Sequence, residues 1–359
     1  MKQSCGSPLL EADAQHPYQR DHVTLNRRER YSDGLRWKLG INTNPCVQLR
    51  RGKRCVYCGF LNYHDPVSPQ KVGQVFRDIF EDNNLDEIHR LELYVSGSFF
   101  DDEEVSLNSR LEIISLASES GIDELLLESR PEFITNENLK SLTNIIDPAR
   151  VTVAIGVETM DDRVRNKLRK GFSTEEFEKS LNRIAYHGMN FQAYLLLNPP
   201  AINNDKKAIL DIISSSMKIV RLAEKMNCNL VLAIQPYFIA KNSLVADNVF
   251  KKNSQKPPWL YTVALTLKLL NTLKTRTESN WQIILGNEND NVVPLLVSSN
   301  YNSDGHVCSC TKTARKYLHE FNISPKKMGE SINRILESSC DCRRIWESQI
   351  GAKISKLQL

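Results

Sequence analysis

Short apolar runs alternate with amphipathic helical segments through most of this chain, from about Trp37 onward. Each apolar run is rich in leucine or β-branched residues and ends near Gly, Ser or Pro, a pattern that predicts a buried β-strand. The predicted strands are Leu91–Ser96, Glu124–Ser129, Val151–Gly156, Phe191–Leu197 and Leu230–Tyr237, followed by a weaker one at Trp281–Leu285.

Helices are predicted between these strands. Ser173 and Glu176 form a capping-box pattern that starts one helix. Apolar residues at helical spacing between Ile209 and Val220 predict a second, longer helix, and a third is expected to run to Leu270. Strands and helices that alternate in this way are typical of βα units, so we expect an α/β fold whose parallel strands wind into a barrel or part of one.

Three regions are expected along the chain. Residues 1–34 are polar and charged with little periodicity, which predicts a mobile or wrapping N-terminal arm. Residues 35–286 contain the alternating strands and helices of the barrel. Residues 287–359 form a polar region with its own cysteines, which predicts a small C-terminal Cys-rich subdomain.

The composition is that of an ordinary soluble globular protein, with 41% hydrophobic and 25% charged residues. No apolar run is long enough for a membrane span, and the N-terminus lacks the apolar core of a secretory signal. The nine cysteines are an odd number and fall mostly in metal-type clusters, so a disulfide scaffold is not expected. We therefore expect a cytoplasmic protein with no membrane partner. The net charge of +4 permits nucleic acid binding but does not by itself predict it.

Three cysteines carry the most specific chemical signal in the chain. Cys46, Cys55 and Cys58 follow the spacing C-x8-C-x2-C, with basic residues between positions 50 and 54 that favour the thiolate forms. Three thiolates can hold three irons of a [4Fe-4S] cluster and leave the fourth iron open to a small molecule. A zinc site with a fourth ligand elsewhere, such as His64, and an accidental cluster are the alternatives.

The cysteine order together with the strand-end residues resembles the radical S-adenosylmethionine superfamily. Several longer segments resemble the radical subunit of archaeosine synthase, a family related to the Elongator-type radical enzymes that act on tRNA. The segments that carry this resemblance are 94–104, 128–134, 154–159, 193–200 and 257–260. The resemblance implies a partial (β/α)6 barrel, similar to part of a TIM barrel, with a [4Fe-4S] cluster and S-adenosylmethionine as cofactors.

The resemblance also implies roles for particular residues. The three cysteines are the cluster ligands and the catalytic centre, and Phe60 lies near the adenine. A small-residue turn after the first predicted strand presents backbone groups to the methionine amine, and Gly97 in that turn allows a close approach. The implied cofactor-binding residues are Phe60, Ser96, Gly97, Ser98, Glu128, Arg130 and Glu158. An ordinary turn and surface ion pairs are the alternatives for all of these strand-end residues.

The activity implied by the resemblance is a radical C–N lyase step on a lysine-bearing 7-deazaguanine in tRNA, which yields archaeosine. It involves a lysine-transferring partner subunit and an external electron donor. A charged stretch between Cys46 and Cys55 and the lack of an evident RNA-binding module leave a second hypothesis open, in which the substrate is a small amino-acid or amine metabolite or a peptide. A third hypothesis is a metal-holding assembly subunit without turnover. Tyr194, Gln235 and Tyr237, on or near strand ends, are candidates to line the substrate cavity, with core packing as the alternative.

A second cysteine group lies in the C-terminal region. Cys308 and Cys310 form one C-x-C pair, and Cys340 and Cys342 form another. Four thiolates complete a closed tetrahedral zinc site, which is the favoured interpretation. A second iron–sulfur cluster fits the same ligand count, and buried free thiols are a further alternative.

Overall fold

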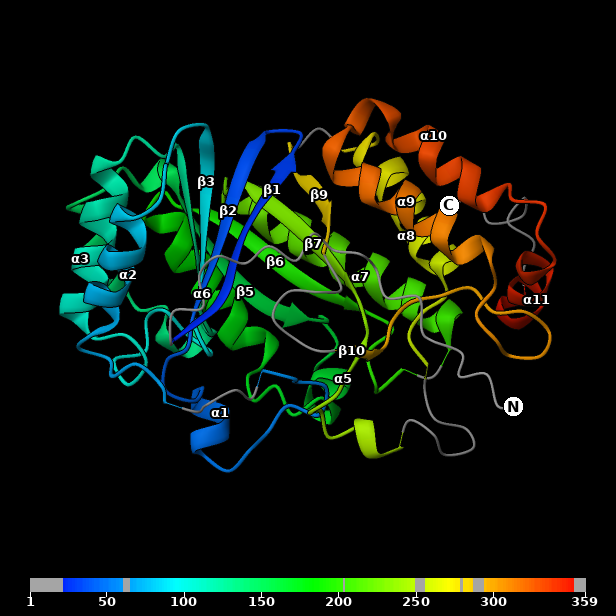
Figure 1. Cartoon of the computed structure of the whole chain (residues 1–359), viewed down its shortest axis with the longest axis horizontal. Coiled ribbons are helices and arrows are strands. Elements are labelled where there is room, and N and C mark those ends of the chain that lie inside the picture. Colours follow the sequence, from blue (N-terminus) through cyan, green and yellow to red (C-terminus); the bar gives the residue numbers. More distant parts are fainter. Residues whose placement is uncertain are drawn as a thin grey trace, which may run out of the picture.

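The fold is built around one eight-stranded sheet that curls into a half-barrel (Figure 1). The computed structural model describes residues 22–60, 65–202, 204–248, 256–277, 280–286 and 294–351. The strand order is β1-β2-β3-β4-β5-β6-β7-β9, in which β1 is antiparallel to β2 and all the other neighbours are parallel. The strands are β1 (Val23–Tyr31), β2 (Gly34–Ile41), β3 (Ile88–Tyr94), β4 (Glu124–Glu128), β5 (Val151–Glu158), β6 (Asn190–Leu197), β7 (Leu230–Pro236) and β9 (Gln282–Leu285).

The α/β half-barrel and the six predicted strands are confirmed, but the expected N-terminal arm is wrong where the structure describes it. Residues 23–31 form edge strand β1, which pairs with β2 over its whole length. The sequence concealed β1 because an edge strand buries few side chains, here Leu25 and Tyr31, and leaves most of its charged residues outside the core. Residues 1–21 of the expected arm lie outside the described residues.

Strand β2 was missed for a different reason. Its outward face is apolar, with Trp37, Leu39 and Ile41 buried, but its other face carries Arg36 and Lys38. Both cations are buried inside the barrel, because β2 alternates its side chains between the helical layer and the lumen. Charged residues in a strand therefore broke the apolar run that sequence reasoning looks for.

Helices cover the outer face of the sheet, as expected for βα units. The capping box that starts α6 is confirmed, since the Ser173 hydroxyl accepts from the Glu176 N–H and the Glu176 carboxylate accepts from the Ser173 N–H. The α-helices of the barrel region are α1 (Val47–Arg50), α2 (Val72–Glu81), α3 (Leu107–Glu119), α4 (Asn136–Thr143), α5 (Asp162–Lys167), α6 (Thr174–Tyr186), α7 (Asp205–Lys225) and α8 (Leu260–Lys274). Short 3-10 helices are η1 (Pro131–Phe133), η2 (Pro148–Arg150) and η3 (Ala246–Asn248).

Three C-terminal helices lie together at one side of the half-barrel, next to α8 (Figure 1). They are α9 (Cys310–Ile323), α10 (Pro325–Leu336) and α11 (Asp341–Ile350). A two-stranded sheet, β8 (Ile239–Ala240) with β10 (Pro294–Leu296), also joins this region to the barrel. The indole N–H of buried Trp346 donates to the Thr262 hydroxyl of α8 at 2.8 Å. The expected domain boundary near residue 287 stays a prediction.

Asn322 of α9 connects the two edges of the sheet. Its side-chain amide accepts from the Leu285 N–H at 2.9 Å and donates to the Leu285 carbonyl at 2.7 Å, on the last residue of β9. Its own carbonyl accepts from the Ser32 N–H, in the turn after β1, at 2.9 Å. The C-terminal helices thus fix the position of both open edges of the half-barrel. Among the described residues, no helix is long and apolar enough to cross a membrane.

Candidate functional site

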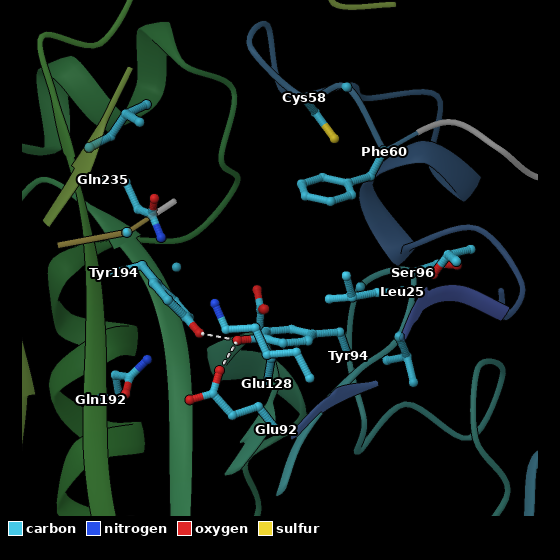
Figure 2. Close-up of a pocket in the computed structure, with 18 of the residues that line it drawn as sticks. Leu25, Cys58, Phe60, Glu92, Tyr94, Ser96, Glu128, Gln192, Tyr194 and Gln235 are labelled. Carbon is cyan, nitrogen blue, oxygen red and sulfur yellow. Dashed lines mark hydrogen bonds between the residues drawn. The ribbon is translucent and has the colours of Figure 1, made fainter. Parts of the chain in front are cut away.

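A cavity of about 550 Å³ lies inside the half-barrel. It is lined by the ends of several strands and by the loop that carries Cys58 and Phe60. Figure 2 shows these two residues at one end of the cavity and Gln192 and Glu92 at the other. Both edges of the sheet contribute to the wall, through residues of β1 and β9. The cavity therefore runs from the cysteine loop into the lumen of the barrel.

The structure brings most of the predicted site residues to this cavity. Those that line it directly are Cys58, Phe60, Ser96, Gly97, Glu128 and Glu158, together with the three candidate substrate residues Tyr194, Gln235 and Tyr237. The phenyl ring of Phe60 is half exposed, at 50% of its accessible area. Four other predicted residues are not among those that line the cavity, and these are Cys46, Cys55, Ser98 and Arg130.

The three cysteines of the first motif share one region of the structure. Cys46 precedes α1, and the N–H of Cys58 donates to the Cys55 carbonyl at 3.3 Å. Burial first, and then the charges of Cys55 and Cys46, raise the pKa of Cys58 to about 12. Burial and the charge of Cys46 likewise raise the pKa of Cys55. These charge interactions place the three cysteines in one part of the structure. His64, the alternative fourth ligand, lies outside the described residues.

The cations that favour the thiolate of Cys55 differ from those expected. Against the effect of burial, Lys170 and Arg130 give the largest lowering of the Cys55 pKa. Of the basic residues that flank the motif, Arg50 instead pairs with Asp101 and Arg51 with Glu132. A basic residue that neighbours a cysteine in the sequence is therefore not always the one that lowers the pKa of its thiol.

The turn after β3 packs directly against the first cysteine. A Cβ added at Gly97 would lie 2.2 Å from the Cys46 Cβ and 2.9 Å from its Cα. The Ser96 N–H donates to the Thr43 hydroxyl at 3.0 Å, and the Ser96 hydroxyl donates to the Thr43 carbonyl at 2.8 Å. Buried Glu104 accepts from the Ser98 N–H at 3.0 Å. Only glycine fits at position 97, and the turn is fixed from both sides.

Ser98 and Arg130 join the ends of β3 and β4. The Ser98 hydroxyl accepts from the Arg130 N–H at 3.2 Å, so this side chain has a positioning role. The Arg130 guanidinium donates to Glu132 at 2.9 Å and lies over the Phe172 ring, at 5.6 Å from its centroid. Its Nη2 atom is buried and has no hydrogen-bond partner among the described residues. An unsatisfied buried donor of this kind suits an acceptor on a bound molecule.

Glu158 belongs to a buried group that sequence reasoning did not find. The Lys170 ammonium donates to the Glu158 carboxylate at 2.8 Å, and the Tyr57 hydroxyl donates to the same oxygen at 2.7 Å. A Cβ at Gly156 would lie 2.6 Å from the Lys170 Nζ, so a larger residue there would push this ammonium group aside. Tyr57 lies between Cys55 and Cys58, and the group therefore holds the cysteine loop against the end of β5. No pattern in the sequence marks Lys170, which follows α5.

Glu128 is different, because no hydrogen-bond partner of its carboxylate is found among the described residues. Burial raises the pKa of Glu128 to about 7, which Lys170 opposes and Glu158 reinforces. The side chain lines the cavity at the end of β4 (Figure 2). A buried carboxyl group that lacks a partner is ready to accept from hydroxyl groups of a bound molecule.

The far end of the cavity is a floor of fixed polar groups. The Tyr94 hydroxyl donates to Glu92 at 2.8 Å and lies 3.2 Å from the Tyr194 hydroxyl. Although burial opposes it, Arg90, Lys38 and Arg36 lower the pKa of Glu92 to about 2. Glu92 is therefore ionised at neutral pH and can only accept hydrogen bonds.

The four C-terminal cysteines also come together. Their sulfur atoms all lie within 4.8 Å of one another, with Cys308 and Cys340 at 3.3 Å and Cys310 and Cys342 at 3.3 Å. Around one tetrahedral ion with Zn–S bonds of about 2.3 Å, neighbouring sulfurs lie about 3.8 Å apart. The Tyr261 hydroxyl of α8 lies 3.1 Å from the Cys342 sulfur. The geometry fits a single metal ion that ties α9 and α11 to α8.

Comparison with known proteins identifies relatives of this chain. None of the family models compared with it matches. An uncharacterized protein of Methanocaldococcus jannaschii is 27% identical over 89% of this chain and 83% of its own length. Archaeosine synthase subunit beta of Methanosarcina acetivorans is 24% identical over 72% of this chain and 68% of its own. The corresponding subunit of Thermococcus kodakarensis is 26% identical over 63% of this chain and 69% of its own length. The chain is thus similar to archaeosine synthase β subunits over most of its length.

This similarity confirms the resemblance predicted from the motifs. The solved structures that resemble the chain are more distant. SuiB of Streptococcus suis, bound to S-adenosylmethionine, is 10% identical, with a TM-score of 0.48 over 68% of this chain and 49% of its own. Elp3 of Methanocaldococcus infernus is 11% identical, with a TM-score of 0.45 over 80% of this chain and 64% of its own. Both similarities are weak, so the assignment of the fold rests on the strand order itself.

Proposed function

We propose that this chain is a radical S-adenosylmethionine enzyme that catalyses a C–N lyase step on a lysine-modified 7-deazaguanine in tRNA and yields archaeosine. One observation carries the proposal: the cysteine loop contributes Cys58 and Phe60 to one end of a cavity whose other end is a polar floor. Similarity to archaeosine synthase β subunits supports the choice of substrate. We propose that the enzyme acts in the cytoplasm.

The residues present fit the two cofactors. Three neighbouring thiols match three irons of a [4Fe-4S] cluster. The unsatisfied Nη2 of Arg130 and the unpaired carboxylate of Glu128 are a donor and an acceptor suited to a carboxylate and to ribose hydroxyls. When bound, the cluster and S-adenosylmethionine together supply a 5′-deoxyadenosyl radical that takes a hydrogen atom from the substrate.

The protein's own contribution is placement and exclusion of water. The Gly97 turn holds Cys46, and the Glu158–Lys170–Tyr57 group holds the loop with the other two cysteines. The enclosed lumen keeps a reactive species away from bulk solvent, and the floor fixes the substrate at the opposite end. Holding the reacting carbon close to the cofactor lowers the entropic part of the barrier. A lysine-transferring partner subunit and an external electron donor complete the proposed pathway.

The test is an anaerobic assay of the chain reconstituted with iron and sulfide. With S-adenosylmethionine and a reductant, we expect 5′-deoxyadenosine from the wild type, and none from Cys55→Ser. Cys228→Ser is the matched control, since Cys228 lies outside both cysteine groups and donates to the Met189 carbonyl. A fully clustered wild type that forms no 5′-deoxyadenosine would contradict the proposal and favour the assembly-subunit hypothesis.

The substrate is tested by mass spectrometry of nucleosides from tRNA. Transfer RNA that carries the lysine-modified 7-deazaguanine is incubated with the reconstituted chain, and archaeosine is the expected product. Formation of 5′-deoxyadenosine without any change in the tRNA would instead support a small amine metabolite or a peptide as the substrate.

We further propose that Cys308, Cys310, Cys340 and Cys342 hold one zinc ion. The support is the close sulfur packing, which leaves no position for a substrate and suits a structural site. Metal analysis of the chain purified under air, before any iron is added, is expected to give one zinc per chain. Iron and sulfide at this site would favour the second-cluster alternative.

A further inference from the structure

The floor of the cavity presents hydrogen-bonding groups whose direction is already set. Gln192 and Tyr194 lie two residues apart on β6, so both side chains point into the lumen. Their Cα atoms are about 7 Å apart along the strand. In Figure 2 they lie below Gln235 and beside Glu92, at the end of the cavity away from Cys58. Gln192 is bonded to Arg90, and Tyr194 is linked to Glu92 through Tyr94; these hydrogen bonds determine what each residue offers to a ligand.

Tyr194 offers an acceptor. The Tyr94 hydroxyl lies between Glu92 and the Tyr194 hydroxyl. Because Glu92 is an ionised carboxylate, the Tyr94 hydroxyl must donate its proton to Glu92. The oxygen of Tyr94 then accepts from the Tyr194 hydroxyl, 3.2 Å away. With its single proton used in this way, the Tyr194 oxygen has only lone pairs to present to the cavity.

Gln192 offers a donor. Its Oε1 accepts from the Arg90 guanidinium at 2.8 Å, and both side chains are buried. Because arginine can only donate, this bond fixes the orientation of the amide. The Nε2 group, with two protons, is therefore the part of Gln192 that faces the ligand.

We propose that Gln192 and Tyr194 read a lactam edge of the substrate, with the ring carbonyl accepting from Gln192 and the adjacent ring N–H donating to Tyr194. This inference rests on the proposed function, because a 7-deazaguanine ring carries such an edge. A ring with the opposite order, an exocyclic amine beside an unprotonated ring nitrogen, meets a donor with a donor and an acceptor with an acceptor. The floor thus selects a guanine-like ring against an adenine-like one, because mismatched buried polar groups are left without partners.

The test measures binding, without turnover, of two free bases, 7-deazaguanine and 7-deazaadenine. Calorimetry is carried out anaerobically on the reconstituted chain with S-adenosylmethionine and no reductant. The wild type is expected to bind 7-deazaguanine at least about tenfold more tightly than 7-deazaadenine. Tyr194→Phe removes the acceptor and is expected to weaken 7-deazaguanine binding about tenfold.

Gln192→Glu gives the sharper readout. A carboxylate at position 192 still accepts from Arg90, so the floor stays folded, but it replaces the donor with an acceptor. The preference for 7-deazaguanine is expected to fall by about tenfold or more, or to reverse, which loss of packing alone would not produce. The controls are Gln282→Glu and Tyr186→Phe, the same changes at exposed positions, and these are expected to keep the wild-type preference.

An unchanged preference in Gln192→Glu would overturn the inference, and so would a wild type that binds both bases equally or binds neither. The proposed function fails separately, when no 5′-deoxyadenosine forms in the reductant assay. A chain that forms 5′-deoxyadenosine yet keeps its base preference after Gln192→Glu would keep the function and lose this assignment.

Discussion

Substitution of Gly97 by alanine places a methyl group in the tightest contact of the cysteine loop. The added Cβ would lie 2.2 Å from the Cβ of Cys46, 2.9 Å from its Cα and 2.8 Å from the Glu104 carboxylate. Atoms of the backbone and of a buried side chain cannot move aside as the tip of an exposed side chain can. We expect the strain to be relieved by displacement of Cys46, the first of the three proposed cluster ligands.

Overpacking of a filled interior costs about 1–3 kcal/mol. If Cys46 must return to its place to bind iron, a cost of about 2 kcal/mol lowers the affinity for the cluster about thirtyfold. We therefore expect Gly97→Ala to fold, to take up iron and sulfide, and then to lose them to a chelator much faster than the wild type.

The assay follows the visible absorption and the iron content per chain during exposure to a chelator under anaerobic conditions. Gly329→Ala is the control, since Gly329 lies in α10 with nothing within 4 Å of an added Cβ. It is expected to retain the cluster as the wild type does. Equal cluster retention in Gly97→Ala and wild type would refute the close packing of the turn against Cys46.

Three further predictions concern other parts of the structure. Asn322→Leu removes both side-chain hydrogen bonds to Leu285, so the free energy of unfolding should fall by about 1–3 kcal/mol. Hydrogen exchange of the β9 amides should become faster. An unchanged exchange rate would contradict the link between the sheet edges. Burial raises the pKa of Asp211 to about 6 from 3.8, so the native state keeps a proton that the unfolded chain releases, and stability falls as pH rises from about 4 through 6. The variant Asp211→Asn, which can still accept from Thr159, should lose this fall, which is on the order of 2 kcal/mol in the free energy of unfolding measured with urea between pH 4 and 6. The same pH dependence of stability in both proteins would disprove this. Cys342→Ser should abolish zinc binding and lower the melting temperature; full zinc content in the variant would contradict the four-cysteine site.

The sequence was sufficient for the parts of the fold that follow simple periodicity. The buried central strands β3 to β7 are apolar on the helical side and end in small or polar residues, so their positions were predictable. Strands β1 and β2 were not, because they carry charged residues whose partners lie on neighbouring strands. Arg36 pairs with Glu92 at 3.0 Å, and Lys38 pairs with Glu29 at 3.0 Å. These ion pairs form only when the strands lie side by side, so the sequence alone does not reveal them.

The same distinction holds for the site. Local spacing marked Cys46, Cys55 and Cys58 as candidate cluster ligands, since such ligands follow a sequence pattern, and this role stays a prediction. Lys170 and Arg130 act on Cys55 through space from other loops, and no spacing predicts that. Gln192 could have been found, because it alternates with Tyr194 on a strand whose polar residues share one face.

The central claim, a cluster with one open iron at the mouth of the cavity, is tested most directly by electron paramagnetic resonance. The spectrum of the reduced, reconstituted chain is recorded before and after S-adenosylmethionine is added. Binding at the open iron predicts a clear change in the g values of the cluster signal. A [4Fe-4S] signal that stays the same at saturating S-adenosylmethionine would contradict the account.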